Sequence, residues 1–223
     1  MQCKNNVNRG VFLKNTGCGL CNRKCRVDRD NGEKGFCGET SEIRCGRAAL
    51  HMWEEPCISG TRGSGTVFFT GCVLKCVFCQ NSVLAESKVG KPVTVSRLAE
   101  IFLELQNKGA HNINLVTPTH FVPSIRESII LSKKNGLSVP IVYNTGSYES
   151  VDTIKSLEGL VDIYLPDLKY VSSELSKKYS KVPDYFEVAR KAIGEMVRQT
   201  GTPEFDDDGI MKKGVIVRHL LLP

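Results

Sequence analysis

Residues 67–81 read Val-Phe-Phe-Thr-Gly-Cys-Val-Leu-Lys-Cys-Val-Phe-Cys-Gln-Asn, a short apolar run that leads directly into three cysteines. The apolar run predicts a short buried strand. The cysteines Cys72, Cys76 and Cys79 follow it with the spacing Cys-x3-Cys-x2-Cys, and an aromatic residue stands before the last of them. The stretch therefore predicts a metal-binding loop at the end of a strand.

The number of cysteines in this loop favours an iron–sulfur cluster. Three thiolates suit three irons of a [4Fe–4S] cluster and leave the fourth iron without a protein ligand. Such an iron can bind a small molecule, so the pattern favours chemistry over electron storage alone. The alternatives are a zinc knuckle or unreactive buried cysteines. Zinc normally takes four ligands, and no fourth cysteine or histidine lies close by in the sequence.

Composition narrows the class of protein. The chain has 223 residues, of which 41% are hydrophobic and 24% charged, as is typical of a globular domain. A net charge of +6 with scattered basic residues argues against nucleic-acid binding. We expect no membrane span, because no apolar run is long enough. The start of the chain lacks an apolar signal core, so we expect a cytoplasmic location and reduced thiols.

Beyond residue 66 the hydrophobic pattern alternates between short strands and helices. This alternation predicts a parallel sheet with right-handed crossovers. Residues 1–48 lack periodicity and are interpreted as metal-held loops, and residues 202–214 as a polar loop. The strands are expected at 67–70, 113–116, 139–143, 161–165 and 215–222, and the helices at 96–107, 123–136, 151–157 and 185–199.

A second group of cysteines precedes this region. Cys18, Cys21, Cys25 and Cys37 provide four ligands within one glycine-rich segment. Four ligands suit structural zinc or a fully ligated iron–sulfur cluster, and the spacing does not decide between them. Four unligated thiols are disfavoured, because nothing else in the segment is expected to order it. The remaining cysteines are interpreted as packing residues, namely Cys3, Cys45 and Cys57.

Polar residues follow the predicted strands at their carboxyl ends, where parallel α/β folds place their sites. Asp167 and Lys169 are expected on one face of an extended segment, as ligand contacts or as a surface ion pair. Asn144 follows another strand, with turn formation as its alternative. Arg218 and His219 are expected on opposite faces, so that one of them points inward; we choose His219 as the binding residue.

The three-cysteine loop resembles the cluster loop of the radical S-adenosylmethionine (SAM) enzymes. The run Trp-Glu-Glu-Pro-Cys-Ile-Ser-Gly at 53–60 and the run Gly-Ser-Gly-Thr-Val-Phe-Phe at 63–69 carry the likeness further. They resemble the branch related to pyruvate formate-lyase activating enzyme, in particular its members with a cysteine-rich N-terminal segment. This resemblance implies a partial (β/α)6 barrel of the TIM-like kind. Here it would lack its last strand and be preceded by a small loop-rich metal-binding segment.

The resemblance also implies cofactors and their contacts. The free iron would bind the amino and carboxylate groups of SAM, and an electron from the cluster would cleave SAM to a 5′-deoxyadenosyl radical. Phe78 matches the aromatic residue near the adenine, and Asp167 and Lys169 match a pair that holds SAM. The family's Gly-Gly-Glu segment is replaced by Thr-Pro-Thr-His at 117–120. Thr117, Thr119 or His120 is expected to take over that contact, or His120 to face the substrate.

The function expected from this resemblance is hydrogen abstraction by a radical SAM oxidoreductase. The substrate would be a glycine of a partner glycyl-radical enzyme, and the partners would include an electron donor such as flavodoxin or ferredoxin. Two alternatives stay open. One is a radical SAM reaction on another protein side chain or a small molecule. The other is a non-catalytic redox or scaffold protein with two metal sites. We divide the chain into a metal-binding segment, 1–60, and the barrel, 61–223.

Overall fold

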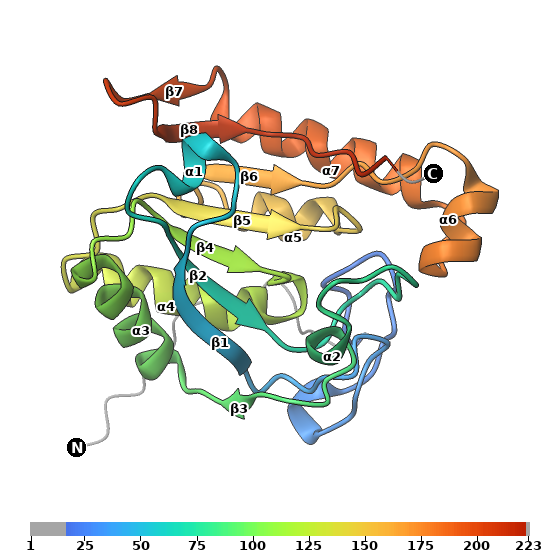
Figure 1. Cartoon of the computed structure of the whole chain (residues 1–223). Coiled ribbons are helices and arrows are strands. Elements are labelled where there is room, and N and C mark those ends of the chain that lie inside the picture. The colour runs from blue at the N-terminus through green and yellow to red at the C-terminus, as the bar shows by residue number, and fades with distance from the viewer. Residues whose placement is uncertain (1–16, 222–223) are drawn as a thin grey trace.

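The computed structural model describes residues 17–221. In this part of the chain eight strands form one sheet, in the order β3-β1-β2-β4-β5-β6-β8-β7 (Figure 1). The pairs β2–β4, β4–β5, β5–β6 and β6–β8 are parallel. The pairs β1–β2, β1–β3 and β7–β8, at the two ends of the sheet, are antiparallel. The strands are β1 (Arg44–His51), β2 (Ser64–Phe69), β3 (Lys91–Pro92), β4 (Ile113–Val116), β5 (Ile141–Thr145), β6 (Ile163–Pro166), β7 (Glu204–Phe205) and β8 (Met211–Val215).

Helices connect the parallel strands, as the sequence pattern predicts. Thr94 accepts a hydrogen bond from the Arg97 amide and so caps α3, whose apolar residues recur at helical spacing. The helices are α1 (Pro56–Ser59), α2 (Ser82–Ala85), α3 (Val95–Asn107), α4 (Val122–Lys134), α5 (Val151–Lys155), α6 (Ser173–Ser180) and α7 (Tyr185–Thr200), with 3-10 turns at Arg29–Asn31 and Thr119–Phe121. No helix among residues 17–221 is long and apolar enough to span a membrane.

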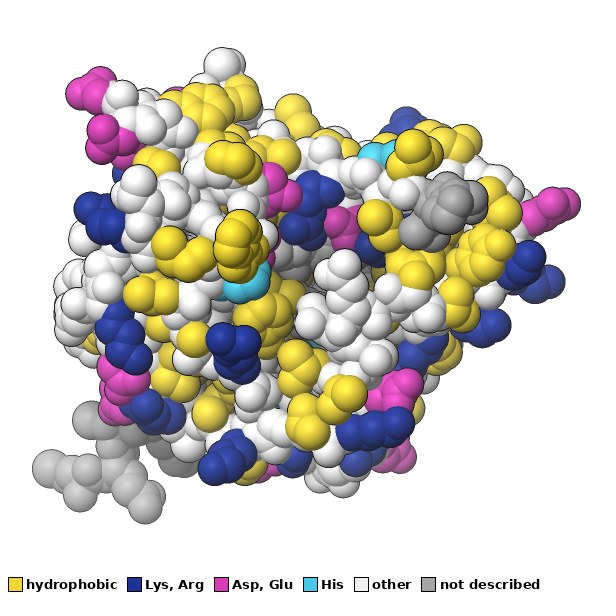
Figure 2. All heavy atoms as spheres, viewed as in Figure 1, with side chains coloured by type: hydrophobic (Ala, Val, Ile, Leu, Met, Phe, Trp, Pro, Cys, Tyr) yellow, Lys and Arg dark blue, Asp and Glu magenta, His cyan; other side chains and the backbone are white. Residues whose placement is uncertain are grey.

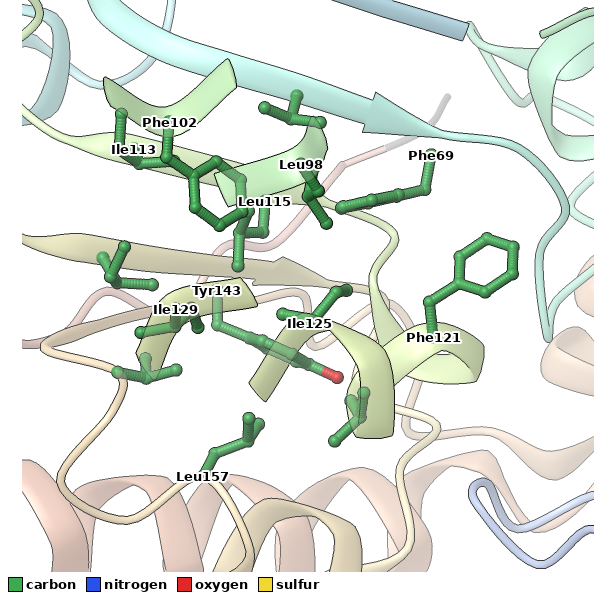
Figure 3. Close-up of a cluster of buried hydrophobic side chains, with 14 of the residues drawn as sticks. Phe69, Leu98, Phe102, Ile113, Leu115, Phe121, Ile125, Ile129, Tyr143 and Leu157 are labelled. Atoms are coloured by element: carbon green, nitrogen blue, oxygen red, sulfur yellow. The ribbon is translucent and has the colours of Figure 1, made fainter. Parts of the chain in front are cut away.

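The main hydrophobic core lies between the sheet and the helices α3, α4, α5 and α7 (Figure 3). Side chains alternate along each strand, so Leu115 and Tyr143 enter this core while their neighbours point to the opposite face. Full burial of a side chain such as Phe102 or Ile125 contributes about 1.5–3 kcal/mol to folding. The core therefore fixes which residues face the other way.

We call that opposite face of the parallel strands the inner face. The strand register places Asn114 beside Val142, and Asn144 beside Leu165. Ile58 of α1 packs on Val142 and Leu165, so α1 covers part of this face. Figure 1 shows the connection between β1 and α1 passing in front of the sheet. The inner face is thus bounded by the sheet on one side and by the β1–α1 connection on the other.

Three expectations about secondary structure are wrong. Residues 44–51 are not a loop but the strand β1, which pairs with β2, so the sheet begins before residue 61. Residues 202–214 form most of the β7–β8 hairpin, in whose turn Asp206 Oδ1 accepts the amides of Asp208 and Ile210. The last parallel strand therefore starts at Met211 and not at Val215. The helix α6 was not expected.

The pairing of the last segment continues beyond β8. Ile216 donates its amide to the Tyr164 carbonyl at 3.0 Å, and Arg218 donates to the Pro166 carbonyl at 2.9 Å. Asp167 and Arg218 then form an isolated parallel bridge. The extended chain expected after 215 is thus present as far as Arg218, although Leu222 and residues 1–16, which include Cys3, lie outside the described residues.

Candidate active site at the carboxyl ends of the strands

The three-cysteine loop leaves the carboxyl end of β2 through a glycine. Gly71 has φ +76°, and a Cβ atom there would lie 2.7 Å from the Cys37 carbonyl oxygen and 2.6 Å from Glu39 Cγ. Only glycine accommodates this conformation and this contact together. Cys72 then donates its amide to the Cys37 carbonyl at 3.3 Å, so the loop is built against the cysteine-rich segment.

All three thiols of the loop are partly shielded from solvent. Burial raises the pKa of Cys72 to about 12, and the nearby thiols of Cys76 and Cys79 add to that rise. Burial also raises the pKa of Cys76, while a hydrogen-bonding contact with the Ser180 hydroxyl at 2.9 Å lowers it. The three thiols are therefore close enough to affect one another electrostatically.

This donor set fits an iron–sulfur cluster better than a single ion. Among residues 17–221 no three Cys, His, Asp or Glu side chains come together closely enough to coordinate one ion. A cluster binds each thiolate through a different iron, so its ligands lie further apart. The three thiols stand on one short loop, and Cys72 and Cys76 pack against an apolar cluster that includes Val73 and Leu74.

Asp167 and Lys169 come together, as predicted, after the end of β6. Lys169 Nζ lies 2.5 Å from Asp167 Oδ2, and both side chains are mostly shielded from solvent. The backbone here is held by Tyr185, whose hydroxyl donates to the Asp167 carbonyl at 2.7 Å and accepts the Lys169 amide at 3.0 Å. The pair is therefore a supported part of the fold and not a loose surface ion pair.

The cysteine loop and this ion pair are neighbours. The charge of Lys169 lowers the pKa of Cys76, and the charge of Asp167 raises it. Gly146, after β5, lies between them: a Cβ atom there would be 2.8 Å from Leu74 of the loop and 3.8 Å from Lys169 Cε. Thiols, carboxylate and ammonium thus surround one region at the carboxyl ends of β2, β5 and β6.

Arg218, and not His219, joins this set. Its Nε donates to Asp167 Oδ1 at 2.9 Å and its Nη2 donates to Asn144 Oδ1 at 2.5 Å. His219 is exposed, and its Nδ1 lies 2.5 Å from the Leu168 carbonyl. The alternation of an extended chain predicts that the two side chains point opposite ways. The choice between them depended on the register of the last strand, which the sequence did not reveal.

Thr119 and His120 are buried away from this ion pair. Thr119 donates to Glu149 Oε1 at 2.7 Å, together with Thr145 and Tyr143. Burial raises the pKa of Glu149 to about 7. His120 Nε2 lies 2.7 Å from the Thr70 carbonyl, and burial lowers its pKa to about 3, so the imidazole is neutral. The structure therefore brings neither residue into contact with Asp167 or Lys169.

Phe78 packs edge-on against Tyr170, with ring centroids 6.4 Å apart. The Tyr170 hydroxyl in turn lies 2.8 Å from the Ser180 hydroxyl, which contacts Cys76. Phe78 thus belongs to the apolar surroundings of the cysteine loop. Ser180 and Tyr170 were not expected from the sequence, since they lie about a hundred residues beyond the loop and carry no motif.

The cysteine-rich segment is held by arginines. Arg29 is buried and donates to the backbone carbonyls of Glu39, Thr40 and His120. Arg23 donates to the carbonyls of Val73 and Lys181. These arginines order the segment without a metal, contrary to the expectation that nothing else would do so.

Cys21 and Cys37 lie in the same apolar cluster as Cys72 and Cys76. Burial raises the pKa of Cys21 to about 12. Burial also raises the pKa of Cys37, and the charge of nearby Arg29 opposes that rise only in part. Cys18 and Cys25 affect both thiols electrostatically. The four cysteines are thus near one another and near the first group. Figure 1 shows their segment, in blue, at the carboxyl ends of the strands.

A family model described as the Radical SAM superfamily matches residues 66–204. The chain belongs to the radical SAM superfamily. Membership indicates an enzyme and implies a [4Fe–4S] cluster and SAM as its cofactors. The α/β fold with a mostly parallel central sheet agrees with the partial barrel expected of this family.

This radical SAM protein also has an uncharacterised relative. It is 31% identical over 215 residues to an uncharacterised protein of Methanocaldococcus jannaschii. The match covers 92% of this chain and 57% of that protein. The chain therefore spans little more than half the length of its relative.

Proposed function

We propose that this radical SAM protein abstracts a hydrogen atom from a glycine of a partner glycyl-radical enzyme, with an electron donor such as flavodoxin or ferredoxin. Cys72, Cys76 and Cys79 would hold the [4Fe–4S] cluster, which supplies reductive cleavage of SAM when bound. The observation that carries the proposal is that the three-cysteine loop lies beside the Asp167–Lys169 pair. A Cβ atom at Gly146 would be 2.8 Å from Leu74 of the loop and 3.8 Å from Lys169 Cε, and the charges of the pair act on Cys76. A cluster on this loop would lie beside one hydrogen-bond acceptor, the Asp167 carboxylate, and one donor, the Lys169 ammonium.

The chain's own residues would orient SAM and exclude water. Lys169 would donate to the SAM carboxylate or ribose, and Asp167 would accept from a hydroxyl or amino group. Phe78 with Tyr170 provides an apolar wall beside the loop. Arg218 binds Asp167 and is itself held by Asn144 of β5, which accepts a hydrogen bond from its Nη2. Thr119, His120 and His219 would not contact SAM through the Asp167–Lys169 pair but would support the surrounding structure.

Cys18, Cys21, Cys25 and Cys37 would form the second metal site of the proposal, with zinc or an iron–sulfur cluster. Zinc would require these thiols to draw closer together, because no three of these described residues lie close enough to coordinate one ion. Their support is that Cys18 and Cys25 act electrostatically on both Cys21 and Cys37, and that Cys21 and Cys37 share an apolar cluster with Cys72. Iron and zinc analysis of the wild type and of Cys21→Ala tests this site. A lower iron or zinc content per chain in the variant than in the wild type supports the site, and equal metal content contradicts it.

The test of SAM cleavage uses the anaerobically reconstituted and reduced protein with SAM. The product to be measured is 5′-deoxyadenosine. Cys72→Ala should abolish the product, whereas Cys45→Ala, which removes a thiol from β1 outside both groups, should retain it. Wild-type protein that forms no product contradicts the proposal. A glycyl-radical partner is tested by co-incubation and an EPR doublet on that partner.

A further inference from the structure

Two neighbouring carboxylates face the inner surface of the sheet from the β1–α1 connection. Glu54 Oε2 lies 3.6 Å and Glu55 Oε1 lies 3.7 Å from Arg218 Nη1. The same guanidinium also binds Asp167. Within this group three carboxylates share two cations, Arg218 and Lys169. The group therefore carries an excess of negative charge.

Solvent does little to disperse that charge. The Glu54 side chain is only 10% exposed and that of Glu55 only 26%. Burial raises the pKa of Glu54, and the adjacent Glu55 charge adds to the rise, while Arg218 opposes it. Carboxylates that are removed from water in this way gain most from a further cation or hydrogen-bond donor.

Buried polar atoms without partners lie beside the two carboxylates. Asn114 of β4 is fully buried. Its amide oxygen has no hydrogen-bond partner among the described residues, and its amide nitrogen approaches Glu54 without making a hydrogen bond of normal geometry. Its side chain adjoins the Glu54 carboxyl, whose pKa it lowers. Glu55 Oε2 is also buried and unpartnered. Nearly all buried polar groups in folded proteins are paired, so these atoms indicate a missing partner.

An exposed aromatic ring adjoins this group in the sequence. Trp53 precedes Glu54 directly, and its side chain is 87% exposed. Figure 2 shows this face hollowed near its centre, where dark blue and magenta side chains lie together beside yellow ones. The face of an indole ring attracts cations, by about 0.5–1 kcal/mol at exposed sites.

We propose that Glu54, Glu55, Asn114 and Trp53 bind a primary ammonium or guanidinium group of the substrate. The carboxylates and the Asn114 oxygen would accept its N–H groups, and the indole would cover it from solvent. The assignment rests on the proposed function, because this group lies on the inner face beside Asp167, where the substrate of the radical reaction would enter. It specifies a Lys or Arg side chain beside the reacting glycine of the partner protein.

The test uses the chain's single tryptophan. Trp53 fluorescence is titrated with n-butylammonium, n-butylguanidinium and, as an uncharged control, n-butanol. We expect a saturable change with the two cations and none with butanol. The double variant Glu54→Gln/Glu55→Gln should weaken cation binding at least tenfold. Glu187→Gln, which removes an exposed carboxylate from α7, should bind as the wild type does.

Two results would overturn the inference: equal responses to cation and alcohol, or a double variant that binds as tightly as the wild type. If circular dichroism shows that the double variant does not fold, Glu55→Gln alone replaces it, with at least a threefold loss expected. The ammonium group of SAM has the same chemistry as the proposed ligand. Displacement of n-butylammonium by S-adenosylhomocysteine would assign the carboxylates to the cofactor and contradict a substrate site.

The titration and the cleavage assay fail independently. The titration needs neither cluster nor SAM, so a chain that forms 5′-deoxyadenosine but ignores n-butylammonium loses only this inference. A chain that binds the cations but never cleaves SAM retains the cation site and loses the proposed radical function.

Discussion

Arg218 donates a hydrogen bond from its Nε to Oδ1 of Asp167 across 2.9 Å, and Lys169 binds the other carboxylate oxygen of Asp167. The carboxylate is thus held by two cations from two neighbouring strands. Such charge-assisted pairs fix a side chain more firmly than neutral hydrogen bonds do. Asp167 is therefore the central residue of the ion network beside the cysteine loop.

Asp167→Asn should weaken SAM binding while leaving the chain folded. The amide keeps the size of the side chain but removes the anion between Arg218 and Lys169, so both cations lose their orientation. A charge-assisted hydrogen bond contributes about 1.5–3 kcal/mol, which corresponds to a loss in affinity of tenfold or more. Calorimetric titration of the reconstituted protein with SAM measures the effect. Asp207→Asn in the β7–β8 turn is the control, and equal affinities in the two variants would contradict the role of Asp167.

Gly71→Ala should destabilise the protein more than Gly136→Ala does. Both glycines have positive φ. A Cβ at Gly71 would overlap the Cys37 carbonyl and Glu39, whereas a Cβ at Gly136 would have no other atom within 4 Å. We expect the free energy of unfolding to fall by about 1–2 kcal/mol more at Gly71. Denaturant unfolding of both variants measures the difference. Equal losses would show that the loop does not pack against the cysteine-rich segment as described.

Arg29→Met should loosen the cysteine-rich segment. The guanidinium donates to three backbone carbonyls, which would be left buried without donors. We expect a loss of about 2–4 kcal/mol in the free energy of unfolding. Faster proteolysis of residues 17–40 should accompany it. Arg26→Met, at an exposed position of the same segment, is the control, and the prediction fails if the two variants are cleaved equally fast.

His120 should make the protein sensitive to acid. Burial lowers its pKa in the folded state to about 3, from an ordinary value of 6.5, so below pH 6.5 the unfolded chain binds a proton that the folded chain does not. Stability is then full above pH 6.5 and falls as the pH decreases towards 3, by about 2 kcal/mol between pH 6.5 and 5. Unfolding of the wild type and of His120→Gln at several pH values measures this loss.

The Gln variant should lose less stability over that pH interval, because its side chain does not titrate. His219→Gln, at an exposed imidazole, should follow the wild type. Identical pH profiles for wild type and His120→Gln would contradict a neutral buried imidazole at this position.

The sequence predicted the elements whose periodicity is strong. The helices α3, α4 and α7 and the parallel strands β2, β4, β5 and β6 lie within a few residues of their expected positions. β1 escaped prediction because its residues, among them Arg44, Gly46 and Arg47, show no apolar alternation. It is a strand because β2 offers it a partner, and such long-range pairing leaves no local signal.

The sequence predicted the parts of the candidate site that lie close together in the chain. It did not predict the contacts between residues that are far apart in the chain. Asp167 and Lys169 were expected together because two residues on an extended segment share a face. The place of Arg218 depended on the register of β8, which the hairpin with β7 sets. Glu54 and Glu55 approach the inner face only because the β1–α1 connection crosses it, and Glu149 meets Thr119 only through the ends of two different strands.

The most direct test of the central claim is the EPR spectrum of the reduced protein with and without SAM. Three cysteine ligands leave one iron of the cluster open, so SAM should bind to it and change the spectrum. The changing signal should be absent from Cys72→Ala and present in Cys21→Ala, which assigns it to the loop after β2. A spectrum that does not change on addition of SAM would contradict an open iron and with it the proposed radical chemistry.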